Sequence, residues 1–110
     1  MTTLKIKALS VNGAWQGRRF KTPEYKAFEE EMLLRLPRLI IPQDKQLHLY
    51  LEVGVSSSLA DLDNTIKPIL DVLQKKYQFN DKAIYEIQAV KLIVPKKQEY
   101  IKFELSVLNP

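Results

Sequence analysis

Residues 60–81 read ADLDNTIKPILDVLQKKYQFND, and the rest of the chain is organised around them. An acidic segment, Asp61-Leu62-Asp63, runs here into a pattern of apolar residues at helical spacing. We expect the helix to face the core with one stripe, formed by Leu62, Ile66, Ile69, Leu70, Leu73 and Tyr77. The polar side chains are then expected on the exposed face of the same helix.

The acids at the start of this stretch are spaced for a shared cation. Asp61 and Asp63 are two residues apart, so in an extended segment their carboxylates point to the same side, whereas on a helix they would diverge. Converging carboxylates repel one another unless a cation neutralises them. Because the cluster offers only oxygen ligands, the sequence predicts an extended segment that binds Mg²⁺, with Mn²⁺ as a possible substitute.

The helix is expected to begin with Asp63 or Asn64 as its N-cap. With the cap at Asn64, Pro68 would fall at the fourth helical position, where its missing amide costs a bond only near the end of the ladder. Lys67 shares a face with Asp63 and Asp71, one turn after Asp63. Its ammonium is therefore expected beside the cation and beside a helix N-terminus that favours phosphate.

These residues carry a family resemblance. Asp61-Leu62-Asp63-Asn64 followed by Lys67, Asp71 and Asp81 resembles the core motif of the RusA family of Holliday-junction resolvases, over nearly the whole chain. The resemblance implies a RusA-like endonuclease domain over residues 1–110 that depends on Mg²⁺ and acts as a homodimer on four-way DNA junctions. It also implies that Asp61, Asp63 and Asp81 are essential metal-binding acids, and that Lys67 is an assisting cation.

The position of Asp81 suggests how two subunits would cooperate. A helix from about Asn64 to Lys76 carries the chain roughly 18 Å away from the acidic pair. The residues from Tyr77 to Asp81 return at most about 16 Å, and only if they run straight back along the helix. We therefore expect Asp81 to complete the site of the partner subunit, which gives a homodimer with shared active sites and symmetric cuts.

Composition is compatible with a small protein that meets a polyanion. The chain has 110 residues, enough for one modest core, and a net charge of +4 although four aspartates gather in residues 61–81. It has no cysteine, which excludes disulfides, zinc-thiolate sites and a cysteine nucleophile. The first ten residues contain lysines and no long apolar run, so we expect a cytoplasmic protein with no membrane partner.

A basic segment precedes the first expected helix. Residues 14–21, AWQGRRFK, form a predicted loop in which Arg18, Arg19 and Lys21 alternate with aromatic residues. Basic groups can bind phosphates while aromatic rings stack on bases or fill a core, so this loop is a candidate DNA contact beside the acidic motif. Thr22 and Pro23 then predict a helix from Pro23 to about Leu36. The segment also looks like the N-terminal region of the RusA family.

Alternating apolar residues predict strands over residues 3–10, 47–53, 84–94 and 100–108. Residues 95–98 are expected to join the last two strands as a hairpin. The order βαβαββ predicts a single α+β domain with a mixed, four-stranded sheet and two packed helices. His48 is the only histidine and lies on the polar side of its strand, so we expect a surface residue and not a catalytic base.

Two functions are compatible with these residues. One is a metal-dependent endodeoxyribonuclease in which the aspartates position Mg²⁺ and Lys67 stabilises the transition state. The alternative is a catalytically silent, structure-selective nucleic-acid binding protein of the same fold. The presence of all the acids and of Lys67 favours the nuclease.

Overall fold

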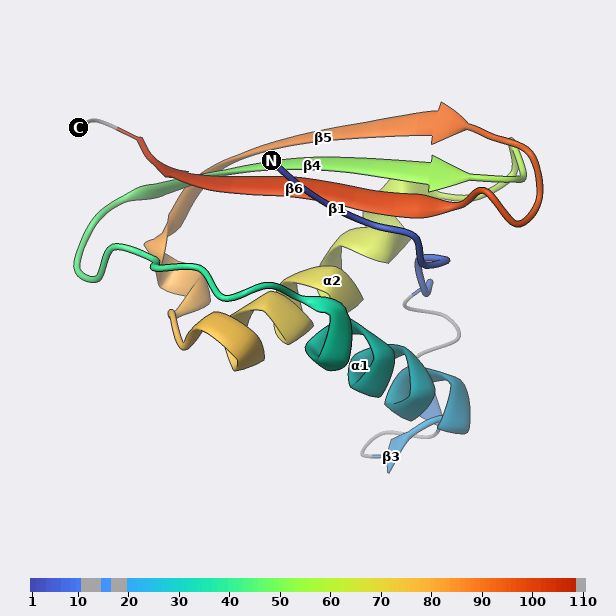
Figure 1. Ribbon diagram of the computed structural model, residues 1–110, viewed down its shortest axis with the longest axis horizontal. Coiled ribbons are helices and arrows are strands. Elements are labelled where there is room, and N and C mark those ends of the chain that lie inside the picture. The colour runs from blue at the N-terminus through green and yellow to red at the C-terminus, as the bar shows by residue number, and fades with distance from the viewer. Residues whose placement is uncertain (11–14, 17–19, 109–110) are drawn as a thin grey trace.

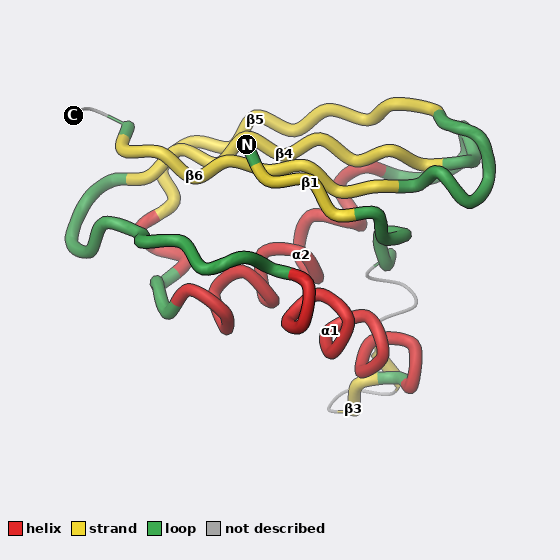
Figure 2. The backbone as a smooth tube through the Cα atoms, in the orientation of Figure 1, coloured by secondary structure: helices red, strands yellow, loops and turns green. Residues whose placement is uncertain are grey.

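A computed structural model of the chain describes residues 1–10, 15–16 and 20–108. Its main layers are a four-stranded sheet and a pair of helices that cover one face of that sheet (Figures 1 and 2). The principal elements are β1 (Thr2–Leu4), α1 (Pro23–Arg35), β4 (Leu47–Val55), α2 (Leu62–Tyr77), β5 (Ile84–Ile93) and β6 (Tyr100–Val107). This single α+β domain in βαβαββ order confirms the predicted fold class.

The sheet has the strand order β1-β6-β4-β5, with β5 parallel to β4, and with β6 antiparallel to both β4 and β1. The prediction of a hairpin between β5 and β6 was wrong, because β4 lies between them. Residues 94–99 instead cross the end of β4. Strand β4 takes the centre because every apolar side chain on its inner face, from Leu47 to Val53, is fully buried.

Helix α1 begins as local sequence rules require. Thr22 caps α1, since its Oγ1 accepts a hydrogen bond from the amide of Tyr25 at 3.2 Å, and Pro23 follows at the first position. The hydroxyl of Tyr77, the last residue of α2, donates to the carbonyl of Pro37 at 2.7 Å. Helix α2 therefore ends against the segment that follows α1.

The core lies between the sheet and the helices, and α2 contributes a different stripe from the predicted one. Leu62, Ile66 and Leu70 are only partly buried. The buried residues of α2 are Thr65, Pro68, Ile69, Val72, Leu73 and Tyr77. The buried stripe is rotated from the predicted one, and Thr65 is accommodated in it by a hydrogen bond from its hydroxyl to the Leu62 carbonyl at 2.7 Å.

Three short elements complete the described structure. Strands β2 (Trp15–Gln16) and β3 (Phe20–Lys21) pair with each other, so part of the segment predicted as a loop is a small two-stranded sheet. A 3₁₀ turn, η2 (Asp81–Ala83), leads into β5 and is capped by Asn80, whose side chain accepts from the Lys82 amide at 2.9 Å. The first strand is shorter than predicted, because it pairs with β6 only from Thr2 to Leu4.

The face of the sheet opposite the helices carries a tyrosine cluster. The hydroxyls of Tyr50 and Tyr100 donate to the two carboxylate oxygens of Glu52, at 2.7 and 2.5 Å. These bonds lower the pKa of Glu52, and the bond from Tyr100 is the main reason that the pKa of Tyr100 rises to about 12. Gly54 lies beneath the Tyr100 ring, where a Cβ atom would come within 2.3 Å of a ring carbon.

None of the helices in the described ranges is long and apolar enough to cross a membrane.

Candidate active site

The acidic motif lies where α2 begins, and its conformation differs from the prediction. Asp61 is the N-cap residue with φ −89° and ψ 117°, and the helix starts at Leu62. The predictions that Asp63 or Asn64 caps the helix, and that Asp61 and Asp63 share one extended segment, were wrong. Asp61 is extended while Asp63 lies in the first helical turn, so the motif places one exposed carboxylate on each side of the strand-to-helix junction.

Asp61 stands at the cap position but makes no side-chain cap bond to the helix. Its carboxylate instead accepts a hydrogen bond from the side-chain amide of Asn64, with 3.3 Å between Nδ2 and Oδ2. The carbonyl of Asn64 lacks its usual helical partner, because Pro68, four residues later, has no amide hydrogen to donate. With the cap at Asp61, Pro68 lies inside the helix and not near its end.

A cavity of about 480 Å³ opens beside this motif. Residues after β1, the loop after β4 and the start of α2 line it, including Lys7, Ser57, Asp61 and Asn64. Glu99 lies on its wall, where its own backbone amide and the Ser56 hydroxyl hydrogen-bond to its carboxylate and lower its pKa; the charge of Lys7 also lowers it. The cavity therefore combines carboxylates, an amide and a cation next to an exposed helix N-terminus.

Lys91 is the site residue that sequence reasoning missed. Its ammonium donates to the carbonyl of Ala60 at 2.9 Å and to that of Ser58 at 3.2 Å, which joins β5 to the segment immediately before Asp61. Lys91 pairs with Val53 in the sheet register and so lies on the inner face of β5. The signal in the sequence was a lysine among the apolar inner-face positions Ile87, Ala89 and Ile93.

Lys67 belongs to a different contact from the predicted one. Its ammonium lies 3.2 Å from Oδ1 of Asp71, one turn further along α2, and the Lys67 side chain is 65% exposed. Asp71 also accepts a hydrogen bond from Tyr25 on α1. Burial, with the charges of Asp71 and Glu29 adding to it, raises the pKa of Tyr25 to about 12. Lys67 thus extends outward from a polar link between the helices.

Asp81 lies at the opposite end of the sheet from Asp61. It opens the η2 turn before β5, and Ile84, the first residue of β5, pairs with Leu47, the first residue of β4. Asp61 comes six residues after Val55, the last residue of β4, and the nine residues of that strand cover about 26 Å. One chain therefore brings Asp61 and Asp63 together at one end of the sheet and keeps Asp81 at the other.

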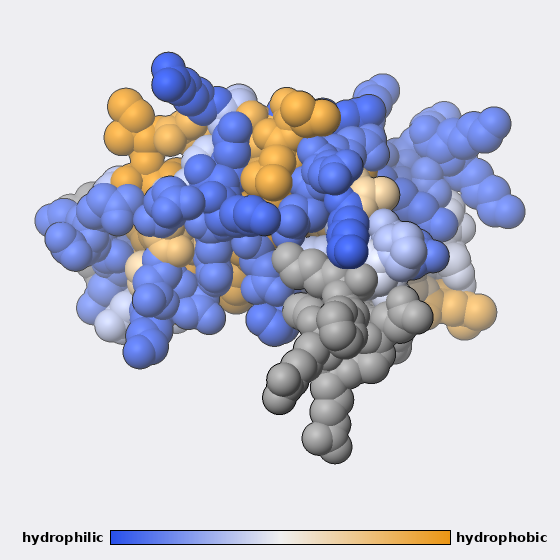
Figure 3. All heavy atoms as spheres, turned by 90° about the horizontal axis from the view of Figure 1, so that it is seen from below, coloured by the Kyte–Doolittle hydropathy of each residue, from blue (hydrophilic) through white to orange (hydrophobic). Residues whose placement is uncertain are grey.

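The predicted DNA-contact residues are only partly placed. Arg18 and Arg19 lie outside the residues that the structure describes. Lys21 is the last residue of β3, immediately before the capping residue of α1. The outer surface of the helix layer, which Figure 3 shows from below, is mostly hydrophilic with separate hydrophobic patches.

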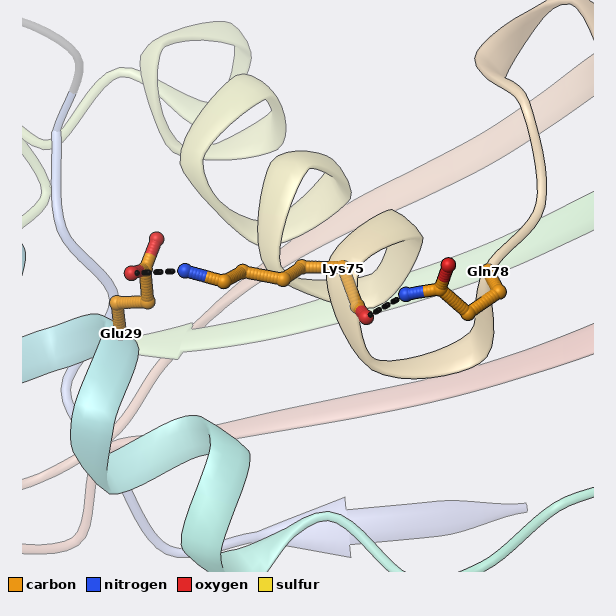
Figure 4. A network of polar contacts seen from close by, with 3 residues as sticks. All are labelled: Glu29, Lys75 and Gln78. Atoms are coloured by element: carbon orange, nitrogen blue, oxygen red, sulfur yellow. Dashed lines mark hydrogen bonds and ion pairs between the residues drawn. The ribbon is translucent and has the colours of Figure 1, made fainter.

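A polar contact fixes the two helices at the far end of α2. The Lys75 ammonium lies 2.9 Å from Oε1 of Glu29 on α1, and the side-chain amide of Gln78 donates to the Lys75 carbonyl at 2.8 Å (Figure 4). The Glu29 side chain is only 14% exposed, so this end of the ion pair is largely shielded from solvent. This cluster supports the fold and lies outside the acidic motif.

The acidic motif fits Mg²⁺ by its donor set. In the described parts of the chain, no three acidic or histidine side chains gather around one point. Mg²⁺ nevertheless needs only one or two carboxylates when waters and a substrate phosphate supply the remaining oxygens. Asp61 and Asp63 are both exposed, and Asp61 lines the cavity, so one chain offers the one or two carboxylates that this requirement names.

No protein-family model matches this sequence, and the search of curated proteins finds no match. The resemblance to the RusA family therefore depends on the spacing of the residues themselves. The function is proposed from that spacing and from the geometry of the site.

Proposed function

We propose that the protein is a Mg²⁺-dependent endodeoxyribonuclease that resolves four-way (Holliday) DNA junctions. The observation that carries this proposal is the state of Asp61, an N-cap residue that lines the cavity and whose carboxylate makes no cap bond to the helix. A short acidic side chain at this position ordinarily bonds to the free amides of the first turn. Here the carboxylate and those amides both remain available for a ligand.

The residues of this chain have distinct proposed roles. The free amides at the start of α2 favour a DNA phosphate, because a helix N-terminus carries partial positive charge. Asp61 and Asp63 would hold Mg²⁺ near that phosphate, and Asn64 keeps the Asp61 carboxylate oriented. Mg²⁺, when bound, lowers the pKa of the attacking water and offsets charge on the phosphate. Lys67 stabilises the negative charge that develops in the transition state. To do so, its exposed ammonium must exchange its contact with Asp71 for one with the phosphate.

The proposed active unit is a homodimer in which Asp81 of one subunit completes the site of the other. The separation of Asp81 from Asp61 within one chain supports this arrangement, since nine residues of strand lie between the two ends of the sheet. A two-fold dimer then has two equivalent composite sites. Two such sites match the two symmetric cuts that resolution of a junction requires.

The alternative is a protein of the same fold that binds DNA junctions without cutting them. The separation of the acids into different places also agrees with this reading, because binding needs no composite metal site. Incubation of the purified protein with a labelled four-way junction decides between them. The nuclease makes paired, symmetric nicks in Mg²⁺ and binds without cutting in EDTA or Ca²⁺, whose looser coordination supports the reaction poorly. Binding without cleavage in both Mg²⁺ and Mn²⁺ would overturn the proposal.

Selectivity is measured in the same assay. The protein is expected to leave a linear duplex of the same sequence intact, and equal cutting of the duplex would contradict junction specificity. Asp63→Asn is expected to abolish cleavage and to leave junction binding equal or tighter, because the substitution removes repulsion between carboxylate and phosphate.

A further inference from the structure

Strand β5 is an edge strand whose outer side is unpaired within the described structure. Its ten residues bond to β4 on one side, and the sheet order ends with β5. In Figures 1 and 2 it forms the margin of the sheet, and no described element lies beyond it. Alternate residues of such a strand direct their N–H and C=O groups outward, which makes the edge a template for another strand.

The same strand exposes large apolar side chains. Tyr85, Ile87, Leu92 and Ile93 are 63%, 40%, 44% and 56% exposed. Ile87 and Ile93 lie on the face toward the helices and Leu92 on the opposite face, so apolar surface flanks the free edge on both sides. A second strand at that edge would cover part of it.

The usual protections against edge pairing are weak along most of β5. It contains no proline, and its only register irregularity lies at its beginning, opposite Leu47 and His48. Both of its charged side chains are held by other groups. Glu86 lies 2.7 Å from Nδ1 of His48, and the Lys91 ammonium bonds to the carbonyls of Ser58 and Ala60.

We infer that β5 pairs antiparallel with β5 of a second copy of this chain, which joins the two sheets around a two-fold axis. The inference rests on the proposed function, because it identifies the surface that would build the shared site. In an antiparallel pair, the start of one strand lies beside the end of the other. Asp81 of the second copy, three residues before its β5, then comes to the end of the sheet where Lys91 and Asp61 lie.

Charge and side-chain pattern fit a second copy better than an unrelated strand. Antiparallel pairing about the middle of β5 sets Glu86 opposite Val94 and Lys91 opposite Ala89 of the second copy, so no like charges lie directly opposite each other. In the joined sheet, the helices of both copies lie on the same side. A register with Val90 opposite Val90 of the second copy satisfies this condition, because directly opposite residues lie on the same face. That register also sets Ile87 opposite Ile93 of the second copy, an apolar pair on the helix side of the sheet.

The first test places positive charge on this edge. Val90→Lys with Leu92→Lys puts two lysines of each copy next to those of the other, where they repel one another. Both positions lie on the face away from the core, so circular dichroism should show a folded chain. The mass from light scattering should halve, whereas the matched surface variant Glu104→Lys on β6 should remain a dimer. A folded Val90/Leu92 variant of unchanged dimer mass would overturn the inference.

The second test does not depend on disrupting the fold. The natural chain has no cysteine, so Val90→Cys introduces the only thiol, and mild oxidation should join most of the protein into disulfide-linked dimers. Gln88→Cys and Ala89→Cys test the neighbouring registers, and Glu104→Cys is the control that should stay unlinked. Failure of every β5 cysteine to link above the level of Glu104→Cys would contradict edge pairing.

These results are separable from the proposed function. A wild-type dimer that links through β5 but leaves junctions uncut in Mg²⁺ would retain the interface and reject the nuclease. Cleavage by a protein whose dimer ignores the β5 substitutions would retain the nuclease and reject the interface.

Discussion

The ammonium nitrogen of Lys91 lies 2.9 Å from the carbonyl oxygen of Ala60, the residue immediately before Asp61. A side chain from an edge strand therefore fixes the backbone from which the first acid of the motif extends. The same ammonium reaches the Ser58 carbonyl, so two points of the loop after β4 are held to β5. Lys91 is in this sense a positioning residue for the segment that leads to Asp61.

Loss of the Lys91 ammonium should slow cleavage more than it weakens binding. Lys91→Met keeps the apolar stem but removes both donors, so the segment before Asp61 loosens. We expect the free energy of unfolding to fall by about 1 kcal/mol. The rate of junction cleavage at saturation should fall roughly tenfold to a hundredfold, because small displacements of a metal-binding group are costly. Lys91→Arg should recover part of the rate, and Lys96→Met in the turn after β5 is the matched control.

Substitution of Arg18 and Arg19 by alanine should weaken DNA binding and flatten its dependence on salt. Each phosphate contact that is lost reduces the slope of log affinity against log salt by about 0.9. Fluorescence anisotropy with a labelled junction over a range of salt concentrations measures this slope. Lys96→Ala with Lys97→Ala removes the same charge from a different turn and serves as the control. An unchanged slope in the arginine variant would show that residues 14–21 do not contact DNA phosphates, and would leave them a role in packing alone.

Gly54→Ala should destabilise the protein through Tyr100. The new methyl group would meet ring carbons of Tyr100 at 2.3 and 2.4 Å, so the ring must move and its bond to Glu52 must stretch. We expect a loss of about 1–3 kcal/mol in chemical denaturation. The same substitution made on Tyr100→Ala should cost clearly less, and an equal cost on both backgrounds would show that the ring is not the cause.

The stability of the protein should fall at alkaline pH through Tyr25. Its pKa rises from 10.0 to about 12 in the folded protein, chiefly because of burial, so the folded state favours the protonated phenol. This contribution is complete below pH 10 and is lost as the pH rises toward 12. Tyr25→Phe should make the free energy of unfolding fall less steeply in that window. Asp71→Asn should leave most of the pKa rise in place, and full reversal would show that charge and not burial dominates.

Much of the fold could be predicted from local patterns. Thr22-Pro23 fixed the start of α1, and the alternation of leucines in residues 47–53 identified the central strand. The pairing of β5 and β6 was mispredicted because a short connection suggests a hairpin, and only the complete sheet shows that β4 lies between the two strands. Strand neighbours depend on long-range packing that periodicity does not contain.

The sequence supplied candidate residues for the site but not their geometry. The alternation rule set Asp61 and Asp63 side by side, yet the helix begins one residue after Asp61 and separates them. Three residues that can each cap a helix follow one another closely here, so local rules did not select among them. Lys91 was missed because its partners are backbone carbonyls distant in sequence, and backbone partners leave no pattern of residue types.

Cleavage by mixed subunits tests the shared-site nuclease most directly. Asp63→Asn and Asp81→Asn proteins, each inactive alone, are mixed, re-associated and supplied with a labelled junction in Mg²⁺, with heterodimers confirmed by differently tagged subunits. In a shared-site heterodimer, one site receives both substitutions and the other receives none. We therefore predict that activity returns as a nick in one strand. Confirmed heterodimers that recover no cleavage would contradict the account.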